Sequence, residues 1–159
     1  MIEYQPIGII YTPFTQPKGT PIQTTAALGK KGTIEIYPQF VQGLKDIEQF
    51  SHLILLYHLH LAKYKDLLVK PFLDNEMHGV FATRSPGRPN RIGFSIVRLE
   101  AVKDNILFIS DVDIVSATPL LDIKPYVLEF DQRTDVRSGW FENNIYKLPD
   151  TKDDGRFSE

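Results

Sequence analysis

The sequence contains no cysteine, which excludes a disulfide framework, a thiolate nucleophile and a zinc site with cysteine ligands. It also has no long uninterrupted apolar run and no signal segment, so we expect a cytoplasmic protein that does not associate with membranes. Neither sign of charge is in large excess, because the formal net charge is −2. Binding to a nucleic acid would therefore need a local basic surface on a mildly acidic body.

The sequence signals of a doubly wound nucleotide-binding fold are missing as well. No G-x-G-x-x-G loop follows a strand and opens a helix, and no βαβ alternation exists that could position such a loop. Helical signal is weak, with short pieces predicted at residues 38–49, 61–68 and 134–143. None of these pieces is long enough to cover a parallel sheet.

The sequence does contain a two-residue alternation of apolar and polar side chains, which is typical of strands. Six segments show it and are rich in β-branched and aromatic residues: 7–11, 33–36, 53–60, 80–83, 94–102 and 106–115. The last two should form a hairpin, because the short linker between them leaves no room for a parallel crossover. Closure into an antiparallel β-barrel is the simplest way to protect the edges of these strands.

Length and composition predict a single domain. A chain of 159 residues with 42% hydrophobic content can bury one substantial core but not two. We assign residues 1–149 to this mainly β domain with a few short helices. Residues 150–159 are charged and carry almost no core-forming side chains, so we expect them to fray.

Residues 79–98, GVFATRSPGRPNRIGFSIVR, form the most informative segment of the chain. Three arginines, Arg84, Arg88 and Arg91, lie in a loop between two predicted strands. The prolines and the glycine between them constrain the backbone, so that the guanidinium groups can converge on an anion or a polar ligand. The alternative is an arginine-rich surface turn that only aids solubility.

A second segment, residues 118–126 with the sequence TPLLDIKPY, places Asp122, Lys124 and Tyr126 at a two-residue spacing. In an extended backbone the carboxylate, the ammonium group and the phenol point to the same side. These residue types fit a structural ion pair with a hydrogen-bonded tyrosine, and they equally fit part of a catalytic site. The spacing alone leaves both interpretations open.

The segments RSPGRPNRIG and LLDIKPY, together with FSHL before an apolar strand, closely resemble the signature blocks of the TsaA-like family. The resemblance runs from about residue 7 to about residue 131. Characterised members of this family are S-adenosylmethionine-dependent tRNA methyltransferases. The resemblance thus implies a β-barrel, a homodimer, and methylation of N6 of the threonylcarbamoyladenosine at position 37 of tRNA.

The same resemblance implies a set of contacts with the cofactor, S-adenosylmethionine. Arg84 is the first candidate for such a contact, and Phe94 is another implied contact. The remaining implied contacts are Thr24, Thr25, Ala26, His60, Leu61, Ser110, Asp111, Val112 and Asp113. Side chains and loop backbone, rather than a helix N-terminus, would hold the carboxylate and sulfonium groups of the cofactor.

Methyl transfer needs the acceptor nitrogen in line with the methyl–sulfur bond, so positioning and a dry pocket supply most of the acceleration. The N6 atom of a carbamoylated adenine resembles a urea nitrogen, and loss of its proton before or during attack would help. We expect Asp122 to be the base. Lys124 and Tyr126 are expected to stabilise negative charge or to bind the threonyl carboxylate.

Arg88, Asn90 and Arg91 are the candidate contacts with the tRNA substrate. The chain departs from the family pattern at Ser116-Ala117, where relatives commonly have Asp-Gly, and at Arg91, where they commonly have proline. The departure at Ser116-Ala117 favours, as an alternative, a methyltransferase of the same fold with another RNA or a small-molecule acceptor. A non-enzymatic module that binds nucleic acids or anions is the third interpretation.

The histidines do not predict a metal site. His52, His58 and His60 have the same parity on one predicted strand. A strand rises by about 3.3 Å per residue, so His52 lies far from His60, and no nearby acidic residue completes a ligand set. We therefore expect no metal.

Overall fold

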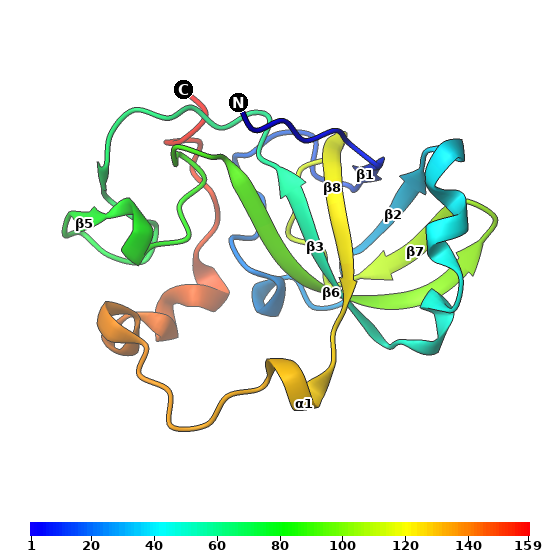
Figure 1. Ribbon diagram of the computed structural model, residues 1–159. Helices are drawn as coiled ribbons and strands as arrows, with labels where there is room; N and C mark the ends of the chain where they lie inside the picture. The colour runs from blue at the N-terminus through cyan, green and yellow to red at the C-terminus, as the bar shows by residue number, and fades with distance from the viewer.

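The structure is a computed structural model that describes residues 1–159. Six strands form a closed antiparallel barrel in the order β1-β2-β7-β6-β3-β8 (Figure 1). Their bounds are Gly8–Tyr11 for β1, Lys31–Ile36 for β2, His52–His58 for β3, Ile92–Lys103 for β6, Ile106–Ser110 for β7 and Thr118–Pro125 for β8. The predicted class, a mainly β protein with an antiparallel barrel and short helices, is confirmed.

The core fills the inside of the barrel because alternate side chains of each strand point inward. In β3, Leu53, Leu55 and Tyr57 are buried, while their neighbours are partly exposed. The matching inward positions of the other strands are aliphatic: Ile10, Ile34, Ile36, Val97, Leu107, Ile109 and Leu120. Closure gives each strand a partner on both sides and so removes exposed edges.

The predicted hairpin is confirmed as the antiparallel pair β6–β7, which begins with Lys103 opposite Ile106. Its second strand is shorter than predicted and ends at Ser110. Asp111 follows with a φ angle of 65°, a left-handed conformation that interrupts a strand. The chain becomes extended again in β8, as the spacing argument for Asp122 and Lys124 assumed.

Two predicted elements are wrong. Residues 80–83 form a 3₁₀ turn (Val80–Ala82) instead of a strand, because both the backbone N–H and the hydroxyl of Thr83 donate to the Val80 carbonyl. Residues 61–68 contain no helix and lead into a two-residue strand, β4 (Leu68–Val69). This strand pairs with β5 (His78–Gly79) in a small separate sheet.

The other predicted helical segments are partly confirmed. Residues 38–49 form two 3₁₀ helices, Pro38–Leu44 and Ile47–Gln49, beside the barrel. In the segment 134–143 only Gly139–Asn143 is helical. A single turn of α-helix, α1 (Leu128–Asp131), and the 3₁₀ helices Thr24–Ala26 and Ile145–Asp150 complete the list. No helix has the length and apolar character needed to cross a membrane.

The C-terminal segment, residues 139–159, lies on the same side of the barrel as β4 and β5, away from the helices of residues 38–49 (Figure 1). Near its end, the Gly19 N–H donates to the Asp153 carbonyl at 2.7 Å, and the Lys63 N–H donates to the Phe157 carbonyl at 2.7 Å. These contacts argue against the fraying that the composition of residues 150–159 predicts. The division at residue 150 stays a prediction.

Candidate active site

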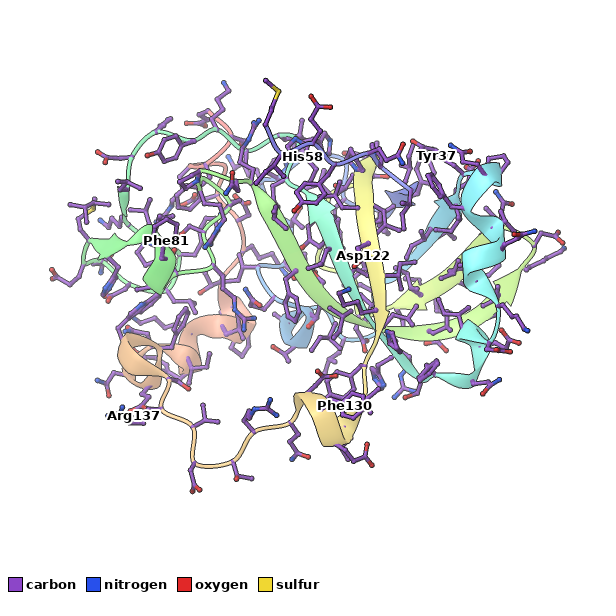
Figure 2. All side chains as sticks on the ribbon, viewed as in Figure 1. Tyr37, His58, Phe81, Asp122, Phe130 and Arg137 are labelled. Atoms are coloured by element: carbon purple, nitrogen blue, oxygen red, sulfur yellow. The ribbon has the colours of Figure 1, made fainter.

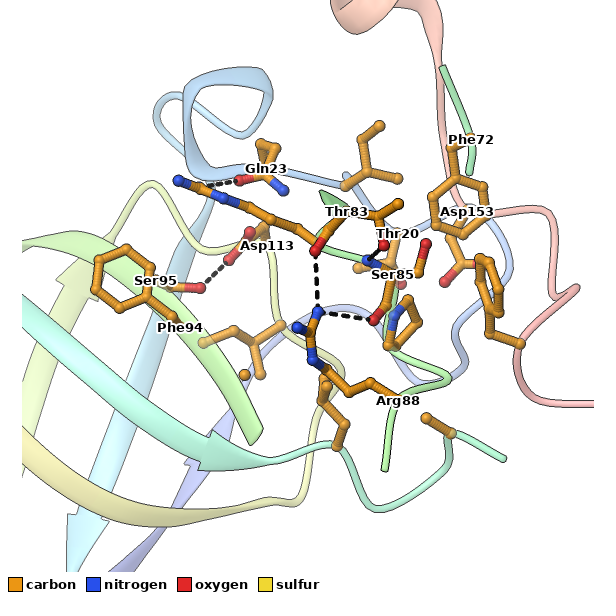
Figure 3. A pocket seen from close by; sticks show the side chains of 18 of the residues that line it. Thr20, Gln23, Phe72, Thr83, Ser85, Arg88, Phe94, Ser95, Asp113 and Asp153 are labelled. Carbon is orange, nitrogen blue, oxygen red and sulfur yellow. Dashed lines mark hydrogen bonds between the residues drawn. The ribbon is translucent and has the colours of Figure 1, made fainter. Parts of the chain in front are cut away.

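A cavity of about 1040 Å³ lies between one end of the barrel and the loops that face it. Its walls come from the ends of β3 and β6, from the loop that follows Ala82, and from the C-terminal segment. A volume of this size suits a ligand larger than a typical metabolite, with additional room for part of a second ligand. Figure 3 shows the polar side chains that converge on it.

Arg88 and Arg84 are the two arginines that line this cavity, and Arg84 is held by side chains of the cavity wall. Its guanidinium donates to the side-chain oxygen of Gln23 at 3.1 Å and lies 5.8 Å from the centre of the Phe94 ring. Both neighbours also line the cavity. The amide and the aromatic face fix the guanidinium while leaving further N–H groups available to an anion.

Asp153 and Asp113 are the two carboxylates that line the cavity, and Asp113 lies close enough to Arg84 to feel its charge. The hydroxyl of Ser95 donates to Oδ1 of Asp113 at 2.7 Å (Figure 3). The Tyr57 hydroxyl lies 2.9 Å from the Ser95 hydroxyl. Burial raises the pKa of Asp113 to about 6, although the Ser95 hydrogen bond and the charge of Arg84 oppose this shift. Asp113 is therefore mostly ionised at neutral pH, and burial of this charge lowers the free energy of unfolding.

His60 lies at the end of β3 and lines the cavity too. Burial lowers the pKa of His60, and the neighbouring His58 lowers it further. The imidazole is thus neutral at physiological pH and can accept or donate a hydrogen bond to a ligand. No group of three or more His, Asp or Glu side chains in residues 1–159 is arranged to hold a metal ion.

The two other arginines of the loop point toward the protein. Arg88 donates from Nη1 to the carbonyls of Thr83 and Ser85, at 3.0 and 3.4 Å (Figure 3). Arg91 donates from Nη1 to the carbonyl of Ala62 at 2.9 Å. These bonds hold the loop in shape, which is a structural role that the sequence did not predict.

The cavity brings together most of the side chains predicted to contact a cofactor or substrate. Those that line it are Thr24, Thr25, His60, Leu61, Arg84, Phe94 and Asp113, with Arg88 and Asn90 of the predicted substrate set. Ala26, Ser110, Asp111, Val112 and Arg91 do not line it. Asp111 instead accepts a hydrogen bond from the Gly29 N–H at 2.8 Å, and Val112 is fully buried in the core.

Asp122, Lys124 and Tyr126 lie outside the cavity wall. Asp122 and Lys124 form a partly exposed ion pair at 2.9 Å on β8, where Figure 2 labels Asp122. The sheet register aligns Asp122 with Leu56 of β3 and then with Phe94 of β6. Asp122 and Phe94 are two strands apart, which corresponds to about 10 Å. Residues that are aligned across neighbouring strands point to the same face of the sheet. The ion pair thus lies on the outer barrel face that also carries Phe94.

Sequence reasoning missed four side chains of this site: Gln23, Tyr57, Ser95 and Asp153. Two of them carried a detectable signal. Tyr57 and Ser95 occupy the inward positions of their strands, where the alternation predicts aliphatic core residues. A hydroxyl at such a position needs a buried partner, and that requirement could have pointed to the Asp113 carboxylate.

The family model that describes the tRNA-methyltransferase O N-terminal domain matches residues 9–132. A protein of Pyrococcus abyssi described as a probable S-adenosyl-L-methionine-binding protein is 62% identical over 157 residues, which are 99% of this chain and 85% of the relative. A human tRNA (adenine(37)-N6)-methyltransferase is 34% identical over 148 residues, 89% of this chain but 34% of the human protein.

Solved structures agree with these matches. The crystal structure of TrmO from Pseudomonas aeruginosa superposes with a TM-score of 0.74 at 39% identity. The match covers 88% of this chain and 62% of the TrmO chain. This chain therefore spans less than two thirds of the human and Pseudomonas relatives, although it spans most of the Pyrococcus protein.

Proposed function

The chain belongs to the family of the tRNA-methyltransferase O N-terminal domain, and from this premise we propose that it is an S-adenosylmethionine-dependent methyltransferase acting on tRNA. The proposed acceptor is N6 of the threonylcarbamoyladenosine at position 37. One observation carries the proposal: a cavity at the barrel end is lined by Arg84, Asp113 and the aromatic face of Phe94. A zwitterionic, cationic ligand such as S-adenosylmethionine needs both charges and an aromatic surface.

We propose that the cavity residues of the predicted set hold this cofactor, which supplies an activated methyl group when bound. Arg84 would bind its carboxylate, and Asp113 would accept a hydrogen bond from its ammonium group or ribose. Phe94 offers a ring face to the sulfonium charge, and neutral His60 offers a hydrogen bond. Thr24, Thr25 and Leu61 would complete the wall, while Ala26, Ser110, Asp111 and Val112 would support it from behind.

We further propose that the acceptor base lies across the outer face of β6, β3 and β8. This face presents Phe94, which is 44% exposed, and Leu56 between the cavity and the ion pair of Asp122 and Lys124. An acceptor stacked on the Phe94 side can extend toward the ion pair about 10 Å away. Asp122 would then take the N6 proton, and Lys124 would hold developing negative charge.

Tyr126, Arg88, Asn90 and Arg91 are proposed to bind the tRNA around the acceptor. Tyr126 follows β8, and its backbone N–H donates to the His52 carbonyl at 3.1 Å. Arg88 and Arg91 use one guanidinium nitrogen each for the loop carbonyls and keep others for phosphate oxygens. Their contribution should therefore combine loop order with electrostatic attraction.

The experiment that tests the proposal is calorimetric titration of the full chain with S-adenosylmethionine, beside Arg84→Ala. The wild type should bind, and the variant should bind at least tenfold more weakly, since it loses a charge-assisted hydrogen bond. Arg133→Ala is the matched control, because Arg133 is exposed and bonded only to the Phe130 and Gln132 carbonyls. Failure of the wild type to bind, with and without tRNA, would reject an enzyme and favour an anion-binding module.

Transfer of labelled methyl groups to tRNA with and without threonylcarbamoyladenosine identifies the acceptor. Methylation of the modified tRNA alone supports the proposed substrate. Methylation of other RNA or of a small molecule would keep the cofactor but replace the acceptor. Asp122→Asn should lower the rate constant for transfer while leaving the affinity for S-adenosylmethionine unchanged, because Asp122 lies outside the cavity.

We also propose that the protein is a homodimer in the cytoplasm. The dimer follows from the family resemblance, and the location follows from the proposed tRNA substrate. Light scattering on the eluting protein measures the mass directly. A mass near 18.2 kDa would reject the dimer, whereas twice that value would support it.

A further inference from the structure

The proposed function leaves one buried group without a task, the tyrosine hydroxyl at the closed side of the cavity. Tyr57 is 6% exposed and Ser95 is 2% exposed, yet both reach the cavity wall. Burial, followed by the charge of Asp113, raises the pKa of Tyr57, so the phenol keeps its proton at any physiological pH. It is a permanent hydrogen-bond donor.

The directions of the hydrogen bonds in this chain are fixed. Ser95 has one hydroxyl proton, and it donates that proton to Asp113 Oδ1 at 2.7 Å. The 2.9 Å contact between the two hydroxyls must therefore be donated by Tyr57. Tyr57 thus orients Ser95, and Ser95 orients the carboxylate through Oδ1, while Oδ2 receives no side-chain donor.

Gly93 shows that the position of the tyrosine ring is built into the barrel. Gly93 lies directly opposite Tyr57 in the β3–β6 pair. A Cβ atom on Gly93 would lie 2.1 Å from Cε2 of the Tyr57 ring, which is closer than any real contact. The ring therefore crosses the backbone of β6 where only glycine leaves space for it.

We propose that Tyr57 and Ser95 are positioning residues for the cofactor. They hold the Asp113 carboxylate in one orientation, with Oδ2 turned to the cavity to accept a hydrogen bond from an ammonium or hydroxyl donor of S-adenosylmethionine. This inference rests on the proposed function and deepens it. A carboxylate held by a rigid chain binds its partner without losing its own rotational freedom on binding.

The test measures binding of S-adenosylmethionine by the full chain between pH 6.0 and pH 8.5, for the wild type, Tyr57→Phe and Ser95→Ala. We expect Ser95→Ala to bind about tenfold more weakly at pH 7, because the carboxylate loses its fixed partner. Tyr57→Phe should have a smaller effect, since Ser95 keeps its own hydroxyl. Tyr37→Phe and Ser51→Ala are the matched controls, because neither residue lines the cavity.

The pH profile separates positioning from a general structural role. The Ser95 hydrogen bond lowers the pKa of Asp113, so its loss should move the acid limb of the binding curve upward by about one pH unit. The charge of Arg84 acts on Asp113, and the charge of Asp113 acts on Tyr57. The other charged or titratable groups that line the cavity are His60, Arg88 and Asp153. These groups are the same in the wild type and in Ser95→Ala, so a difference between the two pH profiles of binding reports on Ser95.

A double-mutant cycle supplies the decisive comparison. If Ser95 acts through the carboxylate, Ser95→Ala should weaken binding no further in a chain that already carries Asp113→Asn. Ser95→Thr, which keeps the hydroxyl, should restore the wild-type pH profile. Equal losses in both backgrounds, or a loss that is the same at every pH, would overturn the proposal. Absence of binding by the wild type would instead reject the proposed function itself.

Discussion

Asp113 is the residue at which the stability of the fold and the proposed role in cofactor binding oppose each other. Its pKa is about 6 in the folded chain against an ordinary value of 3.8, so the folded state binds the proton more tightly than the unfolded state. The free energy of unfolding therefore decreases as pH rises from about 4 to about 6, and the penalty is complete above that range. Removing the charge should stabilise the protein without ligand.

We predict that Asp113→Asn raises the free energy of unfolding by about 1 to 3 kcal/mol at pH 7.5, the upper value being the full difference between the two pKa values. At pH 4.5 the gain should fall to about one third, since most of the carboxyl is already protonated when folded. Urea denaturation at the two pH values measures both quantities. Asp104→Asn, at an exposed turn, is the control. Destabilisation at both pH values would contradict the prediction.

At the residue scale, the sequence indicated which polar residues lie near the cavity, but it did not indicate which groups their side chains bond to. The resemblance implied contacts of Arg84, Phe94 and Asp113 with the cofactor, and the three residues line one cavity. The loop motif did not reveal that Arg88 and Arg91 bond to backbone carbonyls, because no local pattern shows which carbonyls a fold leaves without partners. Whether each residue binds as proposed stays a prediction.

At the scale of elements, the strand patterns succeeded where one face is buried and failed where tertiary contacts decide. Five of the six barrel strands match predicted segments within a few residues, whereas β8 was not among the predicted strands and was treated as extended only in the spacing argument for Asp122 and Lys124. The segment 80–83 has the composition of a strand, but Thr83 caps a 3₁₀ turn that neighbouring loops surround. The short segment between Ser110 and Thr118 is not regular either, since Asp111 and Ala117 both have positive φ angles.

The C-terminal segment has a defined attachment that a single side chain can test. The Phe157 ring packs against Phe72, with ring centres 5.2 Å apart, and against Gly87 of the arginine loop, where an added Cβ would lie 2.9 Å from the ring. We predict that Phe157→Ala speeds tryptic cleavage at Lys152 and Arg156 about tenfold, because loss of about 1 to 2 kcal/mol of packing populates the detached segment.

Tyr146→Ala is the matched control for this prediction. Tyr146 belongs to the same C-terminal segment and is 72% exposed, so its removal should leave the cleavage rate unchanged. Mass spectrometry of the fragments identifies the sites. Rapid cleavage of the wild type at both sites would show that residues 150–159 fray, as their composition predicts.

At the scale of the whole molecule, the cavity is assembled from parts that are distant in the sequence. The family match ends at residue 132, yet Trp140, Leu148 and Phe157 line the same cavity as the barrel residues. Composition could predict a single domain with one core, and the resemblance could predict a barrel. Neither could predict that the C-terminal segment lines the cavity. The segment is held there by backbone contacts with residues 19–21 and 63, which are far away in the sequence and come close only in the folded chain.

This assembly makes binding and folding interdependent, and thermal unfolding can measure the link. A ligand that binds only the folded chain raises the free energy of unfolding by about 2.7 kcal/mol at one hundred times its dissociation constant. For a domain of this size we therefore predict that S-adenosylmethionine raises the melting temperature by roughly 5 to 10 °C. Arg84→Ala at the same ligand concentration should lose most of the shift, whereas Arg133→Ala should keep it. An equal shift in all three proteins would place the ligand outside this cavity, because only Arg84 among the substituted residues lines its wall.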